Sequence, residues 1–234
     1  MKKAIVTLCI GKEAEHWIQY THGPMKLYAK KVNADFIHIK ERKINYNKTK
    51  NINPILFEKY QLYDILCNYD RALYVDSDVL ITLNAPNIFD YVPFDKIGGV
   101  FEDFGMDMID RRKYIKAVQE KLGDLNWTEG FMNTGVFVVS NIHKDAFKLI
   151  WKYGCLDLKY EQTNTNWYFR KMGYEIINID YRFNYMGIMR VYYGTDPREA
   201  YFIHYAGGGI YNWIPRLEQV KLDYEYFYQN NNLI

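Results

Sequence analysis

Apolar and polar residues follow one another in short blocks along the chain, and the spacing inside each block predicts its secondary structure. Compact apolar runs and period-two alternation are typical of strands, because successive side chains of a strand point to opposite faces. By these patterns we expect strands at residues 3–10, 35–39, 71–75, 96–102, 135–139, 174–179 and 201–205. Short strands are therefore spread along most of the chain.

Helical character fills most of the intervals between these strands. We expect helices at residues 13–32, 55–67, 107–122, 146–153 and 162–171. The first should be interrupted at Gly23-Pro24, with Pro24 opening a second helix, since proline lacks the N–H that a helix interior needs. A polar stretch at residues 40–54, rich in Lys and Asn, predicts a surface loop. The tail from Pro215 is amphipathic or irregular.

Strands that alternate with helices predict an α/β fold with a mostly parallel sheet. The 234 residues suffice for one sizeable domain, and no break in composition divides them, so we expect residues 1–234 to form a single domain. In open sheets of this kind, ligands bind beyond the carboxyl ends of the strands. Polar residues that directly follow a predicted strand are therefore the first candidates for a site.

Composition narrows the possible partners and the compartment. The net charge of +2 gives no general argument for binding nucleic acid or a membrane, and no window approaches the ~18 apolar residues of a membrane span. Cys9, Cys67 and Cys155 lie in apolar surroundings without a CxxC pair, so we expect buried thiols in a reducing compartment. The start MKKAIVTLCIG has no small-residue cleavage site after it, so we interpret it as a strand and expect a cytoplasmic protein.

The stretch RALYVDSDVLITL, residues 71–83, places Asp76 and Asp78 directly after a predicted buried strand. Charged groups beside a core are costly unless something pairs with them. In an extended chain the two carboxylates would face opposite sides, but a turn at the strand end lets them converge. Carboxylates suit Mg²⁺ and Mn²⁺, and a metal held by few of them completes its coordination with substrate phosphates. The pattern is typical of a metal–diphosphate site, although turn aspartates also bind backbone amides.

The same two aspartates also fit a second chemistry. With Asp76 as a nucleophile that accepts a phosphoryl group and Asp78 as its general acid, the motif resembles haloacid-dehalogenase-type phosphatases. In that family the motif closes the first strand of the chain, whereas two predicted strands precede it here, and no later acidic pair stands out as a metal site. We keep the phosphatase as a less favoured alternative.

The residues around the two aspartates resemble one family in particular. The segment FEKYQLYDILCNYDRALYVDSDVLITLNAPNIFD resembles nucleotide-sugar glycosyltransferases of the GT-A fold, especially glycosyltransferase family 8 and its glycogenin-like members. Further motifs of that family follow in order: GGVFED, FMNTGVFVVS, YEQTNTN, RFNY and YFIHYAG. The resemblance spans residues 3–213 and implies a GT-A, Rossmann-like three-layer fold around a central, mostly parallel mixed sheet.

The resemblance implies a metal and a donor. Mn²⁺ or Mg²⁺ would be held by Asp76, Asp78 and His204, and Lys59 would contact the diphosphate of a nucleotide-sugar. Transfer of the sugar expels a highly charged nucleoside diphosphate, so a metal and a cation placed there stabilise the charge as it develops.

The resemblance also implies contacts to the rest of the donor. The residues expected near the donor sugar are Asp103, Asn133, Glu161 and Gln162. Carboxylates at that position would stabilise a sugar that becomes oxocarbenium-like. Further contacts to the nucleotide are expected from Thr7 and Cys9 at the end of the first strand, from Ser77, and from Gly207.

Two departures from the family pattern concern the donor site. Glu161 stands where the family has Asp, which keeps the charge and lengthens the side chain. The family expects a lysine at the diphosphate after the histidine, but HYAGGGIYNW keeps only Trp213. Arg216 and the backbone amides of residues 207–209 are the candidates to replace that lysine.

We therefore expect a metal-dependent glycosyltransferase that uses a UDP-sugar, and the family resemblance suggests retention of anomeric configuration. Asp103 or Glu161 would serve as the base in a related inverting enzyme. The acceptor stays open between a glycan, a protein and a small molecule. The missing lysine also fits an alternative, a non-catalytic binder of nucleotide-sugars or carbohydrates.

Overall fold

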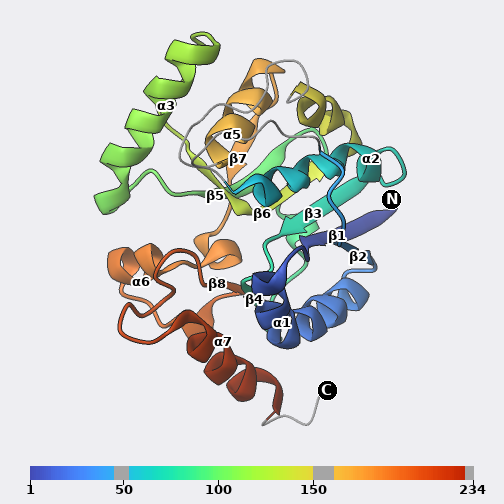
Figure 1. The fold of residues 1–234 in the computed structure, drawn as a ribbon, viewed down its shortest axis with the longest axis vertical. Helices are drawn as coiled ribbons and strands as arrows, with labels where there is room; N and C mark the ends of the chain where they lie inside the picture. Colours follow the sequence, from blue (N-terminus) through green and yellow to red (C-terminus); the bar gives the residue numbers. More distant parts are fainter. Residues whose placement is uncertain (45–52, 150–160, 230–234) are drawn as a thin grey trace.

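The computed structural model describes residues 1–44, 53–149 and 161–229, and at its centre is a six-stranded sheet of order β2-β1-β3-β6-β5-β7 (Figure 1). The strands are β1 Lys3–Leu8, β2 Asp35–Ile39, β3 Arg71–Val75, β5 Ile97–Phe101, β6 Met132–Ser140 and β7 Ile176–Asn178. Within this sheet β6 is antiparallel to both neighbours, and the other pairs are parallel. The predicted α/β fold with a mostly parallel mixed sheet is confirmed.

A second, two-stranded sheet follows the end of β3. Its strands are β4 Val79–Ile81 and β8 Phe202–His204, which pair antiparallel with Val79 opposite His204. The pairing brings the end of β8, far along the chain, beside the turn between β3 and β4. We predicted β8 but not β4, because three residues are too few to establish a period.

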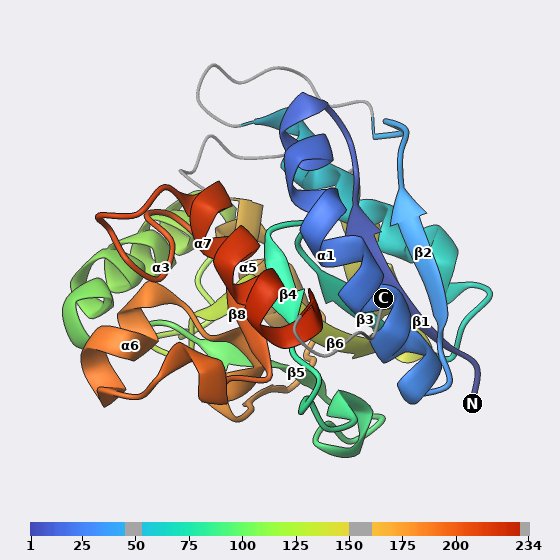
Figure 2. The same ribbon diagram turned by 90° about the horizontal axis from the view of Figure 1, so that it is seen from below.

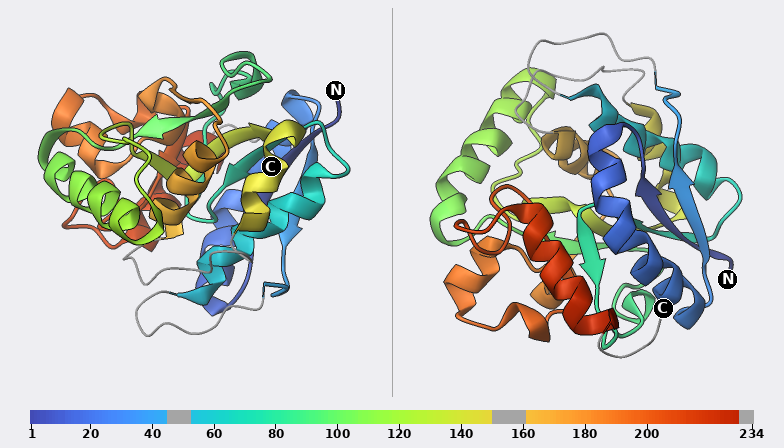
Figure 3. Two further views of the ribbon diagram at one scale, coloured as in Figure 1. Left: turned by 90° about the horizontal axis from the view of Figure 1, so that it is seen from above. Right: turned by 60° about the horizontal axis from the view of Figure 1, so that its bottom comes forward.

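Within the described residues, α-helices surround the two sheets. They are α1 Lys12–Lys31, α2 Leu62–Leu66, α3 Met108–Leu122, α5 Glu161–Lys171, α6 Gly187–Tyr193 and α7 Arg216–Tyr224. The 3-10 helices span Pro54–Gln61, Ile88–Asp90, Gly105–Asp107, Asn141–Lys148, Tyr181–Asn184 and Pro197–Glu199, and a π-helical turn spans Glu225–Gln229. Figure 2 shows α7 beside α1 and β4. Figure 3 shows α3 and α6 at the opposite side of the molecule from β1 and β2.

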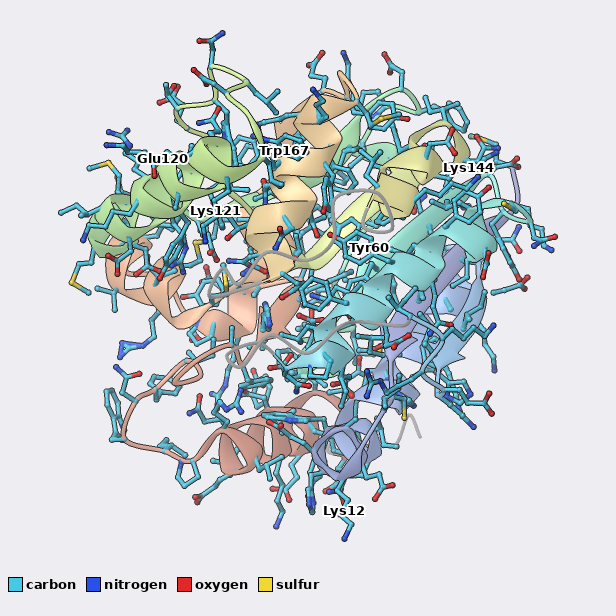
Figure 4. The ribbon with its side chains drawn as sticks, turned by 45° about the horizontal axis from the view of Figure 1, so that its top comes forward. Lys12, Tyr60, Glu120, Lys121, Lys144 and Trp167 are labelled. Atoms are coloured by element: carbon cyan, nitrogen blue, oxygen red, sulfur yellow. The ribbon has the colours of Figure 1, made fainter. Side chains whose placement is uncertain are left out.

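Alternate residues of the main sheet enter two separate cores. In β3, Leu73 belongs to the core that contains the buried face of α1, whereas Tyr74 belongs to the core that contains α2 and α5. Figure 4 shows Tyr60 and Trp167 within the second core, where both are fully buried, and Lys12 at the surface. The period of two along the strands therefore produces three layers, with helices on both faces of the sheet.

Helix α1 runs without a break through Pro24, so the predicted interruption at Gly23-Pro24 is wrong. A proline inside a helix removes one backbone hydrogen bond and costs about 3 kcal/mol. The buried face of α1, which includes Trp17, Met25 and Tyr28, packs against the sheet and β4. Burying three large side chains offsets that cost, since each contributes about 1.5–3 kcal/mol.

Two further helix predictions differ from the structure. We expected a helix over residues 146–153, whereas residues 141–148 form a 3-10 helix. Residues 150–153 of the predicted helix and residues 45–52 of the predicted loop lie outside the described part of the chain. Helix α6 was not predicted, because GIMRVYY carries no clear period. Of the tail from Pro215, which we expected to be amphipathic or irregular, residues 216–229 are helical.

The cysteines are less buried than we expected. Cys67 is exposed at the end of α2 and Cys9 is half-buried, so the expectation of buried thiols is wrong for Cys67, and Cys155 lies outside the described residues. Leu66 is buried, and one step around the helix turns Cys67 to solvent. In the part of the chain that the structure describes, no helix has the length and apolar character needed to cross a membrane.

Candidate active site

The turn between β3 and β4 carries Asp76 and Asp78. The Asp76 backbone N–H donates to the Gly135 carbonyl of β6 at 2.7 Å, and Val79 N–H donates to the Asp76 carbonyl at 3.2 Å. Carboxylate oxygens of Asp76 and Asp78 and a ring nitrogen of His204 all lie within 4.8 Å of one another. The turn thus brings both carboxylates to one side, beyond the carboxyl end of β3.

His204 reaches this turn through the pairing of β8 with β4. The Tyr205 N–H donates to the Asp78 carbonyl at 3.0 Å and continues that pairing past the strand ends. The ring Nε2 of His204 lies 3.4 Å from Asp78 Oδ1, and its Nδ1 lies 2.8 Å from Asn184 Oδ1. Gly135 leaves the space for the ring, because a Cβ there would lie 2.2 Å from His204 Cε1. The three side chains are therefore held from two sheets.

Lys59 lies beneath Asp76 in a buried network of ions. Its ammonium group is 2.6 Å from Glu161 Oε1, 3.3 Å from Asp76 Oδ1 and 3.1 Å from the Thr134 carbonyl. The Tyr74 hydroxyl also donates to Asp76 Oδ1, at 2.7 Å. Burial alone would lower the pKa of Lys59, but Asp76 and Glu161 outweigh it and hold that pKa above its usual value. Lys59 is therefore a charged side chain in the interior, paired as such charges must be.

The two aspartates of the turn have opposite pKa shifts. Burial raises the pKa of Asp76 above its usual value even with Lys59 beside it. Burial acts on Asp78 in the same direction, but His204 and Arg216 outweigh it, so the pKa of Asp78 lies below its usual value. Arg216 Nη1 is 3.5 Å from Asp78 Oδ2. Two carboxylates that face one another repel, and a divalent cation between them would relieve that repulsion.

These groups line an open cavity of about 670 Å³. Its polar lining includes Lys59, Asp76, Asp78, Glu102, Asn133, Glu161, Gln162, His204, Gly207 and Arg216. The volume falls within the ~300–1,000 Å³ of small-molecule sites. Two carboxylates and one imidazole form a donor set that suits Mn²⁺ or Mg²⁺, and the open side leaves room for substrate oxygens.

A sequence model described as glycosyl transferase family 8 matches residues 2–210 of the chain. The chain belongs to glycosyltransferase family 8. The matched region contains the Asp-x-Asp turn, Lys59 and His204, and the match confirms the resemblance predicted from the motifs. A search of curated proteins found no match. The family match supports a glycosyltransferase and leaves the phosphatase alternative without support.

Solved structures show the same fold for this family 8 member. A glycosyltransferase involved in the glycosylation of the major capsid of PBCV-1 is similar with a TM-score of 0.64 and 16% identity, covering 95% of this chain and 100% of that chain. The galactosyltransferase LgtC, in complex with donor and acceptor sugar analogs, has a TM-score of 0.65 and 14% identity, with 96% of both chains covered. GlyE of Streptococcus pneumoniae TIGR4 has a TM-score of 0.60 and 14% identity, covering 100% of this chain and 62% of that chain. At such identities the likeness shows the fold alone, which is the predicted GT-A fold.

Three of the residues expected near the donor sugar line the cavity of this glycosyltransferase. Glu161 accepts from Thr134 Oγ1 at 3.0 Å in addition to its contact with the lysine beneath it. Gln162 Nε2 donates to Glu102 Oε1 at 2.8 Å, and Asn133 Nδ2 donates to Glu102 Oε2 at 2.7 Å. The first turn of α5 and the start of β6 therefore meet at Glu102.

Asp103 is not among the residues that line this cavity. Its two carboxylate oxygens accept hydrogen bonds from the Gly130 N–H at 2.7 Å and the Phe131 N–H at 2.8 Å, which hold the approach to β6. Glu102, one residue earlier, lines the cavity instead. Neighbouring residues at a strand end point to different sides, so only one of the two acids in GGVFED faces the cavity.

The residues expected at the nucleotide are spread more widely. Thr7 is fully buried within β1, Cys9 is half-buried just after it, and Ser77 lies at the apex of the turn, where its carbonyl accepts from Thr21 Oγ1 at 2.9 Å. Thr7, Cys9, Ser77 and Gly207 are the four residues expected to contact the nucleotide. Among the described residues that line the 670 Å³ cavity, Gly207 is the one member of this set.

Sequence reasoning missed two residues that the structure places at the site. Glu102 stands beside Asp103 in GGVFED, and strand alternation was the signal that separates them. Asn184 lies within the RFNY motif, for which we assigned no role, and it contacts His204 directly. Arg216, a candidate to replace the missing lysine, does lie at the cavity, 3.5 Å from Asp78.

Proposed function

We propose that this protein is a metal-dependent glycosyltransferase that moves a sugar from a UDP-sugar to an acceptor, with Mn²⁺ or Mg²⁺ held by Asp76, Asp78 and His204. One observation carries the proposal: ligand atoms of these three side chains converge within 4.8 Å at the wall of the cavity. The bound metal would supply positive charge to the departing diphosphate. We further propose that residues 1–234 act as one glycosyltransferase domain.

Arg216 is the proposed counterpart of the lysine that this chain lacks at the diphosphate. Its guanidinium group donates to the Tyr205 carbonyl at 3.2 Å and lies over the Trp17 ring at 5.2 Å, which holds it at the cavity wall. A guanidinium group binds phosphate oxygens with several N–H groups at once. The cation therefore comes from α7, and the missing lysine does not by itself indicate a non-catalytic binder.

Lys59 and Glu161 have proposed roles at the two ends of the donor: Lys59 at the diphosphate, as the family resemblance implies, and Glu161 at the sugar. The Lys59 ammonium is 2.6 Å from Glu161 and 3.3 Å from Asp76, so it couples the metal turn to the first turn of α5. Glu161 and Glu102 place negative charge along one wall of the cavity, where an oxocarbenium-like sugar would be stabilised. Gln162 and Asn133 are the proposed hydrogen-bond partners of sugar hydroxyls. We propose retention of anomeric configuration on the family resemblance.

The decisive experiment measures protection against heat by UDP with and without Mn²⁺. We expect UDP to raise the melting temperature only when Mn²⁺ is present, and Asp78→Asn to lose this effect. Asp64→Asn, a change of the same type at an exposed position on α2, is the matched control. Equal protection without metal and in Asp78→Asn would show that the metal–diphosphate assignment is wrong.

A panel of UDP-, GDP- and TDP-sugars with Mn²⁺ then tests the donor and turnover. We expect the UDP-sugars to give the largest shift and to release UDP slowly by hydrolysis, and faster when a true acceptor is added. Binding of a UDP-sugar without any release of UDP, across glycan, peptide and small-molecule acceptors, would favour the non-catalytic binder.

A further inference from the structure

A chain of four hydrogen-bonded side chains leads from the end of β5 to His204. Glu102 Oε2 accepts from Asn133 Nδ2 at 2.7 Å, Asn133 Oδ1 accepts from Asn184 Nδ2 at 2.9 Å, and Asn184 Oδ1 lies 2.8 Å from His204 Nδ1. We call Glu102, Asn133, Asn184 and His204 the histidine relay. Its members come from four separate segments of the chain, so the relay exists only in the folded protein.

The direction of the relay is set at Asn133. Its Oδ1 also accepts the backbone N–H of Gly135 at 2.9 Å, while its Nδ2 faces the Glu102 carboxylate. A backbone N–H only donates, and an ionised carboxylate only accepts. The Asn133 amide therefore has one orientation that satisfies both neighbours, and a flip would place two donors together and two acceptors together.

The same logic passes through Asn184 to the ring. Because Asn133 Oδ1 is an acceptor, Asn184 turns its NH₂ group toward it and its Oδ1 toward His204. An amide oxygen only accepts, so His204 Nδ1 carries the proton. When the ring is neutral, its lone pair is on Nε2, which lies 3.4 Å from Asp78 Oδ1. In the charged ring that lowers the pKa of Asp78, Nε2 also carries a proton and points it toward this carboxylate, and a metal ion that binds at Nε2 displaces that proton.

Burial makes these orientations costly to reverse. Asn184 is fully buried, and Glu102, Asn133 and His204 are each at most 7% exposed, so little water can replace a lost partner. An unpaired buried polar group costs about 1–3 kcal/mol. The other carboxylate oxygen of Glu102 accepts from Gln162 and from the Arg111 guanidinium, which compensates its charge. The relay is therefore closed at both ends by charged or metal-binding groups.

We propose that Glu102 is a positioning residue, which acts through Asn133 and Asn184 to hold His204 with its proton on Nδ1 and its Nε2 lone pair free for the metal. The inference rests on the proposed function only in taking the ring as a metal ligand. Groups that orient a ligating histidine raise metal affinity about 10–100-fold. The structure adds that this orientation starts three side chains away from the ring.

The first test needs the wild-type protein alone, without metal. Long-range ¹H–¹⁵N spectra of protein labelled with ¹⁵N-histidine, recorded where the rings are neutral, report which nitrogen of each ring is protonated, and a His204→Gln sample assigns the signal. We expect His204 to carry its proton on Nδ1. A proton on Nε2, or a mixture of both tautomers, would overturn the relay.

The second test uses the isosteric change Glu102→Gln and titration calorimetry with MnCl₂ alone. An amide in place of the carboxylate turns a donor toward Asn133 or toward Arg111, so we expect Mn²⁺ to bind 10–100-fold more weakly and both tautomers of His204 to appear. Glu58→Gln is the matched control, since Glu58 is fully buried and accepts two backbone N–H groups away from the relay. Wild-type affinity and tautomer in Glu102→Gln, or an equal loss in Glu58→Gln, would overturn the proposal.

A third comparison does not depend on whether Glu102→Gln folds. Asn184→Asp keeps an acceptor for the His204 Nδ1–H, whereas Asn184→Ala removes it, so we expect the Asp variant to bind Mn²⁺ at least tenfold more tightly than the Ala variant. Equal weakening in both would overturn the relay. If the wild-type protein binds no Mn²⁺, the proposed function fails, and the tautomer measured without metal still decides the relay.

Discussion

Replacing Gly135 with alanine tests the metal site through a single methyl group. A Cβ at this position would lie 2.2 Å from His204 Cε1, 2.9 Å from its Nδ1 and 3.0 Å from Asn133 Oδ1. Non-bonded carbon atoms sit about 3.5–4.0 Å apart, so the ring has to retreat by roughly 1.3 Å or more. That movement breaks its contact with Asn184 and takes Nε2 away from Asp78.

The consequence for the metal is larger than the consequence for the fold. Metal–ligand distances are met within about 0.2 Å, so a ring displaced by more than 1 Å no longer coordinates. We expect Mn²⁺ affinity, measured by calorimetry with the metal alone, to fall on the order of 100-fold. Overpacking of one methyl group should lower the free energy of unfolding in urea by about 1–3 kcal/mol.

Gly98→Ala is the matched control, because a Cβ there would meet Val92 Cγ2 at the same 2.2 Å, in a strand of the same sheet. We expect a similar loss of stability and unchanged Mn²⁺ affinity. Wild-type Mn²⁺ affinity in Gly135→Ala would refute His204 as a ligand. An equal loss of affinity in Gly98→Ala would show that the effect is a general loss of stability.

Two further predictions concern stability. Lys59→Met leaves the buried carboxylate of Glu161 and the partly exposed carboxylate of Asp76 without their cation, so the free energy of unfolding in urea should fall by about 3 kcal/mol, and adding Glu161→Gln should restore part of it. Burial, with a smaller effect of His38, lowers the pKa of His22 from 6.5 to about 4. As the pH falls, His22 therefore takes up a proton in the unfolded chain before it does so in the folded protein. The free energy of unfolding is unaffected by His22 above pH 6.5 and decreases as the pH falls from 6.5 toward 4. His22→Phe should flatten the urea midpoint against pH over that interval.

Each of these has its own contradicting outcome. A Lys59→Met protein that is as stable as the wild type would show that the three charges do not form a coupled group. For the pH dependence, His16→Phe at an exposed position of α1 is the control, and an equal flattening in that variant would contradict the assignment to His22.

Much of the fold could be predicted because its signals are local. The apolar run before Asp76 required a strand, and the alternation of Leu73 and Tyr74 between two cores follows directly from the period of two. The same local reasoning failed at Pro24, where packing of a long buried face outweighs the local cost of proline. It also failed at Cys67, which follows the buried Leu66 but lies exposed at the end of α2.

The candidate site could be predicted in residue types but only partly in geometry. The Asp-x-Asp turn, Lys59 and His204 were all found from motifs, and the structure brings them to one cavity. The motif pointed to Asp103, whereas Glu102 lines this cavity. Strand alternation separates the two acids only once the bulge and register of β5 against β6 fix which side faces the cavity.

By itself, the sequence determined that a buried strand ends in two carboxylates, that a cation and a histidine occur at family positions, and that strands alternate with helices. Hydrophobic period and charge are enough to show the strand, its two carboxylates and the alternation with helices, whereas the cation and the histidine follow from the family resemblance. Only the tertiary structure decided that Val79 lies opposite His204, that Arg216 lies beside Asp78, and that Glu102 is connected to the ring through Asn133 and Asn184. Those contacts join residues up to 138 positions apart, and the direction of a hydrogen bond between them depends on backbone register, which no local pattern encodes.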